Sequence, residues 1–152
     1  TYQNVTGRRS VSGSIAPQIP NITGTWRGQY FICCGIASGD GVMTWTLTHA
    51  SNATSFSGTM TITGDFLLGG TTTGSIQGAW LADLRQFTFV VSVSPGGIPG
   101  FPGCGMTFNQ SSLTYRSAGA PTNGGPYLDG GFYGNFCTSI PISLGSLQLV
   151  KQ

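Results

Sequence analysis

The chain has 152 residues, of which 39% are hydrophobic and only 7% are charged, and its net charge is +2. This length suits one domain with a single core, and the hydrophobic content excludes a disordered chain. The absence of Glu and the scarcity of Lys argue against a helical bundle. Without a basic cluster, nucleic-acid binding has no electrostatic basis. No apolar run of 18 residues occurs, so we expect no membrane span.

Residues 1–20 carry an alternation of their own ahead of the main strand pattern. One parity holds the apolar residues and a small residue at the centre, namely Val5, Val11, Gly13, Ile15 and Ile19, and serines occupy the other. The segment resembles the N-terminal extensions of donor-strand pilins. That resemblance implies a tail that completes the sheet of the next subunit and builds a head-to-tail filament. We therefore divide the chain into an extension, 1–20, and a domain, 21–152.

Period-2 alternation predicts eight strands in that domain, and no helical pattern interrupts them. The predicted strands are 22–34, 42–49, 55–63, 74–80, 85–93, 104–115 with a bulge, 128–136 and 142–150. Turn chemistry separates them at Gly39–Gly41, Ser51–Asn52, Gly69–Gly70 and Asp83. The predicted interior residues are Trp45, Phe56, Met60, Ile62, Trp80, Phe87, Phe89, Phe108, Phe132 and Phe136.

Eight short strands joined by short connections favour an antiparallel up-and-down barrel, with a β-sandwich as the alternative. Gly24, Thr25 and Trp26 match the Gly-x-Trp signature that opens the first strand of calycins, the lipocalin and avidin-type barrels. The strand rhythm over 22–151 is similar to that family. The resemblance implies that Trp26 plugs the barrel, that Lys151 covers it, and that the chain carries a small apolar ligand.

Four cysteines, Cys33, Cys34, Cys104 and Cys137, lack the spacing of a zinc site and favour disulfides over buried free thiols. In an up-and-down meander all four meet at one rim. A bond between the neighbours Cys33 and Cys34 would close a strained small ring. We therefore expect each of them to bond to Cys104 or Cys137, and the spacing leaves the choice open.

Four of the six Asn residues head a glycosylation sequon, and these are Asn4, Asn21, Asn52 and Asn109. Because Ser and Thr are abundant, sequons also arise by chance. Low charge, disulfides and sequons together favour an extracellular or cell-surface protein. The chain starts at Thr1, as expected if a signal peptide has been removed.

Titratable residues are few, and they do not form a catalytic pattern. The four carboxylates are Asp40, Asp65, Asp83 and Asp129, and most of them fit turn positions. A lone His49 ends the second strand, and no nucleotide or nucleophile motif occurs. We expect no enzymatic activity, no metal and no cofactor.

Two functions remain open from the sequence. The first is a structural subunit that polymerises with copies of itself through its N-terminal strand. The alternative is a secreted carrier of a small apolar ligand, because an eight-stranded barrel is just wide enough to be filled or to hold one.

Overall fold

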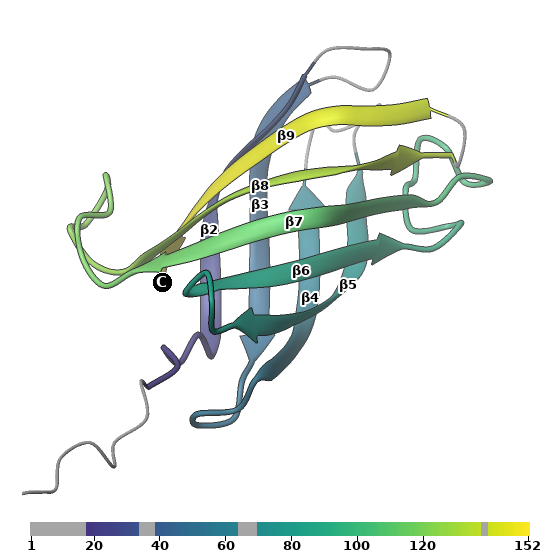
Figure 1. The fold of residues 1–152 in the computed structure, drawn as a ribbon. Coiled ribbons are helices and arrows are strands. Elements are labelled where there is room, and N and C mark those ends of the chain that lie inside the picture. The colour runs from purple at the N-terminus through teal and green to yellow at the C-terminus, as the bar shows by residue number, and fades with distance from the viewer. Residues whose placement is uncertain (1–17, 34–38, 64–69, 138–139) are drawn as a thin grey trace, which may run out of the picture.

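The computed structural model describes residues 18–33, 39–63, 70–137 and 140–152, and within them the chain is all β (Figure 1). Its strands are β2 Gly24–Cys33, β3 Gly39–Thr48, β4 Ser55–Thr63, β5 Thr71–Leu81, β6 Gln86–Val93, β7 Met106–Arg116, β8 Tyr127–Phe136 and β9 Ile140–Lys151. Each strand pairs antiparallel with the next, and β9 pairs with β2 to close the ring. The prediction of an up-and-down barrel is confirmed over the alternative of a sandwich.

The strands alternate between a buried inner face and an exposed outer face, as the sequence pattern predicts. The ten aromatic and aliphatic residues expected inside are all buried except Trp80, which is half-buried against the core. The bulge predicted in β7 is present, because its pairing with β8 shifts register between Asn109 and Ser112. Period-2 patterning therefore placed the core correctly.

One predicted turn is wrong. Residues Gly39–Gly41 begin β3 and extend the ladder with β2, where Gly41 lies opposite Tyr30 and Gly39 opposite Ile32. The Tyr30 side chain leaves no room for a residue with a side chain at 41, since a Cβ there would lie 2.9 Å from its Oη. Gly41 therefore makes room for a large inward ring instead of turning the chain.

The two ends of the barrel differ in the segments that cover them. At the lower end in Figure 1, where β2 begins and β9 ends, residues 18–23 run without strand structure into β2. At the upper end, the β6–β7 connection folds inward with Ile98 completely buried and Phe101 packed edge-on to Phe136 at 5.3 Å. The described barrel is thus closed by side chains at both ends.

Aromatic rings fill the interior between these ends. Trp45 packs edge-on to Phe89 at 5.1 Å, and Phe132 lies 6.5 Å from Phe89 and stacks on Phe108 at 4.2 Å. Each of these four side chains is at most 2% exposed. The interior that the described residues enclose is a packed aromatic core.

Hydroxyl groups dominate the outer wall of β3, β4 and β5. Cross-strand register sets Thr46 opposite Thr59, and Thr59 opposite Ser75. A second row sets Thr44 opposite Thr61. Threonine suits strands because its branched Cβ fits the pleated surface. The wall therefore meets water through neutral hydroxyls.

We predict that Gly134→Ala destabilises the barrel by about 1–3 kcal/mol, because a Cβ at this inward position would overlap the Thr107 carbonyl oxygen of β7. Gly131→Ala in the same strand is the matched control, since its Cβ would have no atom nearer than 3.5 Å. Thermal unfolding of both variants tests this. An equal midpoint for the two would contradict the close approach of β7 and β8.

Candidate functional site

Trp26 closes the lower end of the barrel, as the Gly-x-Trp pattern predicts. Its side chain is completely buried, and its indole Nε1 donates a hydrogen bond to the Ile22 carbonyl oxygen at 2.9 Å. Lys151 places its Nζ 5.3 Å from the centroid of the Trp26 ring and donates to the Thr23 carbonyl oxygen at 2.7 Å. A side chain at Gly24 would crowd this lysine, whose Cε would lie 3.0 Å from the added Cβ.

The segment before β2 is anchored by a group of polar contacts that we call the latch. The Ile19 amide donates to Asn52 Oδ1 at 3.0 Å, and the Ile22 amide donates to His49 Nδ1 at 3.3 Å. Asn21 Nδ2 donates to the His49 carbonyl oxygen at 3.0 Å. Ile19 and Ile22 are themselves buried in the core. The latch therefore fixes residues 19–22 to the β3–β4 turn by both hydrogen bonds and apolar burial.

His49 is structural in this geometry. It is 3% exposed, and its Nε2 lies 2.7 Å from the Ala53 carbonyl oxygen. Because a carbonyl only accepts, Nε2 carries the proton and Nδ1 is free to accept from Ile22. The ring also packs edge-on to Phe56 and Phe87. Both nitrogens are used in holding the latch, which leaves neither for proton transfer to a substrate.

We predict that His49→Phe destabilises the protein by about 2–4 kcal/mol. The substitution keeps an aromatic ring against Phe56 and Phe87 but leaves the buried Ile22 amide and the Ala53 carbonyl without this partner. Urea unfolding measures the loss, and Thr48→Ala at the exposed neighbouring position serves as the control. A His49→Phe variant as stable as that control would show that the latch contributes nothing to stability.

Of the five residues predicted to form the donor strand, the described chain includes only Ile19. Val5, Val11, Gly13 and Ile15 lie outside the described residues. Ile19 is 9% exposed and belongs to the core of its own barrel. Ile19 therefore packs within its own chain, and a role for it in an interface with a neighbour stays a prediction.

The cysteines meet at the upper end, but the expected pairing is wrong. Cys104 and Cys137 are bonded to each other, with Cα atoms 4.6 Å apart. The pairing follows from the ladder, because Met106 and Phe136 are opposite each other where β7 begins and β8 ends. In the ring, β9 lies between β8 and β2, so strand pairing does not bring Cys33 opposite Cys137. Cys33 is also disulfide-bonded, and Cys34 lies outside the described residues.

Three of the four sequons are described. Asn21 and Asn52 have exposed side chains at the latch, and Asn52 adopts a positive φ of 57° in the turn after β3. Asn109 lies half-buried in β7 at the bulge. Asn4 lies outside the described residues. Glycosylation of all four stays a prediction.

Tyr30 is a buried phenol whose pKa lies above its ordinary value. Its phenol faces inward from β2 and is 2% exposed. Burial raises the pKa of Tyr30 to about 12, and the nearby Asp40 carboxylate contributes in the same direction. The neutral phenol is thus favoured in the folded protein.

This shift predicts alkaline sensitivity. The unfolded phenol ionises near its ordinary pKa of 10.0, whereas the folded one ionises at about 12. The stability that Tyr30 contributes is therefore present below pH 10 and is lost as pH rises toward 12. Urea unfolding at about pH 9 and about pH 11.5 tests this window. Between these two pH values, the stability of Tyr30→Phe should fall less than that of the unmodified chain. The stability of Tyr133→Phe, at an exposed site on β8, should fall as much as that of the unmodified chain.

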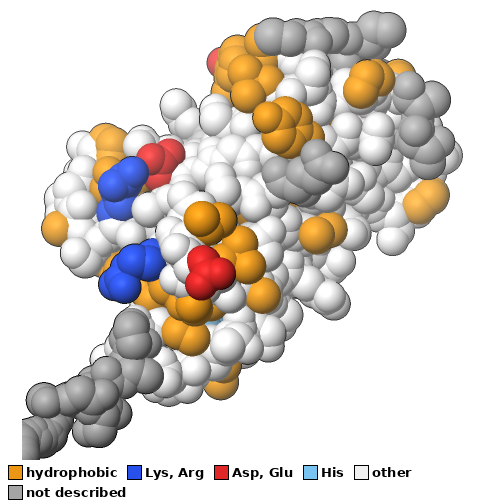
Figure 2. All heavy atoms as spheres, in the orientation of Figure 1, with side chains coloured by type: hydrophobic (Ala, Val, Ile, Leu, Met, Phe, Trp, Pro, Cys, Tyr) orange, Lys and Arg blue, Asp and Glu red, His pale blue; other side chains and the backbone are white. Residues whose placement is uncertain are grey.

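An apolar strip lies on the outer wall toward the upper end. It consists of Phe31 on β2, Leu144 on β9 and Tyr133 on β8, which are 48%, 51% and 50% exposed. Leu144 is opposite Cys33, two residues along β2 from Phe31. Figure 2 shows apolar side chains on the surface close to the upper edge of the view, where β2 and β9 lie. Sequence reasoning missed this strip, because each residue stands alone on the outer parity of its own strand.

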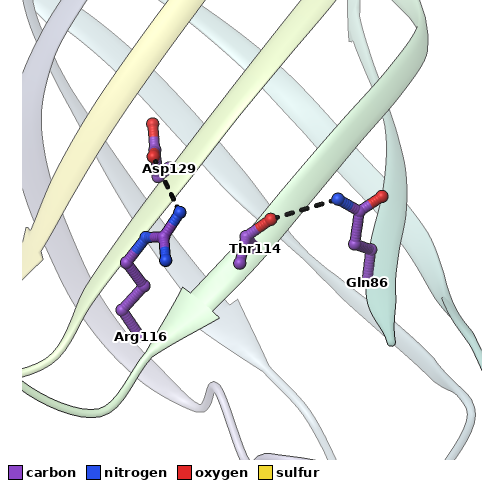
Figure 3. Close-up of polar contacts among 4 residues, drawn as sticks. All are labelled: Gln86, Thr114, Arg116 and Asp129. Atoms are coloured by element: carbon purple, nitrogen blue, oxygen red, sulfur yellow. Dashed lines mark hydrogen bonds and ion pairs between the residues drawn. The ribbon is translucent and has the colours of Figure 1, made fainter. Parts of the chain in front are cut away.

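A groove of about 810 Å³ follows the outer wall of β2 and β9. Its polar side chains include Arg27, Gln29, Asp129 and Gln148. Asp129 Oδ2 lies 3.6 Å from an Arg116 guanidinium nitrogen in an exposed ion pair, which Figure 3 shows beside β7.

Farther around the wall, Gln86 Nε2 donates to Thr114 Oγ1 at 3.3 Å (Figure 3). An exposed ion pair such as that of Arg116 and Asp129 stabilises a fold by about 0–1 kcal/mol.

Potential metal ligands do not cluster in the described part of the chain. No three His, Cys, Asp or Glu side chains there lie close enough to hold a metal ion. The described part of the chain contains no helix long and apolar enough to cross a lipid bilayer. Comparison with known proteins found no matching family profile, no matching curated protein and no matching solved structure.

Proposed function

We propose that this chain is a non-enzymatic structural subunit of an extracellular assembly, joined head to tail to copies of itself through residues 1–17. The observation that carries the proposal is the latch. It fixes residues 19–22 by buried side chains and hydrogen bonds, directly after the segment with apolar alternation. A neighbour that binds Val11 and Ile15 would therefore be coupled to a rigid barrel.

The filled interior supports a structural role over a carrier role. A carrier of the calycin type needs space between its strands for the ligand. Here Trp45, Phe89, Phe108 and Phe132 occupy the described interior, and each is at most 2% exposed. No observation in the described barrel favours the carrier alternative.

The closed ring determines how a neighbour's N-terminal segment would bind. Strands β2–β9 leave no free edge, so the segment has no vacant place in the ladder. We propose that it lies on the apolar strip instead, with Val11 and Ile15 against Leu144 and Tyr133. The latch is at the lower end and the strip is toward the upper end. A contact between two different surfaces of this kind is heterologous and propagates head to tail.

An extracellular location is part of this proposal. The Cys104–Cys137 disulfide is compatible with an oxidising compartment, since such bonds are rare in the cytosol. Asn21 and Asn52 are exposed at the surface of the described chain, where each side chain also makes a hydrogen bond of the latch.

Light scattering after size exclusion, with negative-stain imaging, tests the assembly. The full chain should form concentration-dependent multimers, and both Ile15→Asp and Leu144→Asp should reduce them to monomers. Ser14→Asp, on the other parity of the segment, and Thr59→Asp, on the hydroxyl wall, are the matched controls and should still assemble.

Two results would contradict the proposal. One is a full-length chain that stays monomeric at every concentration. The other is a set of multimers that survive both Ile15→Asp and Leu144→Asp.

A further inference from the structure

The groove over β2 and β9 has the size and position of a ligand site. Its volume of about 810 Å³ lies within the range of roughly 300–1,000 Å³ typical of small-molecule sites. Backbone of both strands lines it, and Pro121 and Thr122 of the β7–β8 connection stand at its lower end. Ala120, beside them, is 4% exposed, so this connection is packed onto the barrel.

The cross-strand register places side-chain amides and a carboxylate in one row across the groove. Gln29 of β2 is opposite Gln148 of β9, and Gln148 is opposite Asp129 of β8. An amide side chain both donates and accepts hydrogen bonds, and an ionised carboxylate accepts. The side chains of Gln29 and Gln148 are exposed on the outer face of the ladder.

The charges of the groove are mixed. Three of the chain's ten charged residues line it, and they are Arg27, Asp40 and Asp129. Asp129 is paired with Arg116, which leaves Arg27 and Asp40 with opposite charges, so the lining favours neither an anion nor a cation. A purely apolar ligand would cover these groups without satisfying them, which is costly. The lining therefore suits a neutral ligand that has many groups able both to donate and to accept.

An aromatic ring completes this chemistry. Phe31 lines the groove with 48% of its surface exposed, and it is opposite Ser146 on β9 and Asp40 on β3. A flat apolar face next to hydrogen-bonding side chains matches a sugar ring, which has an apolar C–H face and an equatorial rim of hydroxyls.

We propose that this groove binds a neutral oligosaccharide. The sugar ring packs on Phe31, and its hydroxyls exchange hydrogen bonds with Gln29, Gln148 and Asp129. The groove shares Phe31 with the apolar strip, whereas Leu144, the residue changed in the assembly test, does not line the groove.

Titration of the ¹⁵N-labelled full chain with cellotriose, maltotriose and triacetylchitotriose tests the proposal by NMR, with sialyllactose as the acidic comparison. At least one neutral sugar should shift amide signals of β2 and β9 around the groove and saturate below about 10 mM. Sialyllactose should not bind.

Gln148→Leu should weaken that binding at least about ten-fold. Gln77→Leu, an exposed outer-wall glutamine on β5, is the matched control and should bind as the unmodified chain does. The same spectra show whether each variant is folded. The proposal is overturned if none of the three neutral sugars shifts these signals, if only sialyllactose does, or if the two glutamine variants bind equally well.

Discussion

The pairing of β2 with β9 is the constraint on which the rest of the structure depends. It joins the two ends of the domain over eight register positions, from Trp26 opposite Lys151 to Cys33 opposite Leu144. The same ladder brings the lysine to the indole, sets Gln29 beside Gln148 and removes the last free edges of the sheet. Without it the aromatic core would be open along one side, and neither the capped lower end nor the outer groove would exist.

Much of the fold follows from the sequence because inward and outward alternation survives in nearly every strand. The alternation indicates which face of a strand a residue occupies, but it does not indicate which residue on another strand it contacts. Cys104 and Cys137 were correctly expected at one end with Cys33, yet their mutual bond depends on which strands are neighbours in the ring. Gly39–Gly41 has turn composition, yet it is extended because it pairs with β2, where Gly41 makes room for the inward Tyr30 ring.

The functional surfaces were less predictable than the core. Trp26 and Lys151 were found because they follow a short pattern in the chain. The latch joins Ile22 to His49, 27 positions away, through one ring nitrogen, and nothing local in either residue indicates it. Gln29, Gln148 and Asp129 each look like ordinary solvent-facing residues of a strand. They become a candidate site only when closure of the ring puts three separate strands side by side.

The hydroxyl rows on β3, β4 and β5 have a consequence for the medium in which the protein works. A surface that is hydrated by threonine and serine has little charge for dissolved ions to screen. A change in salt concentration should therefore alter the electrostatics of this surface very little. Hydration of this wall depends on neutral groups that neither acid nor added electrolyte alters, which suits the extracellular location proposed above.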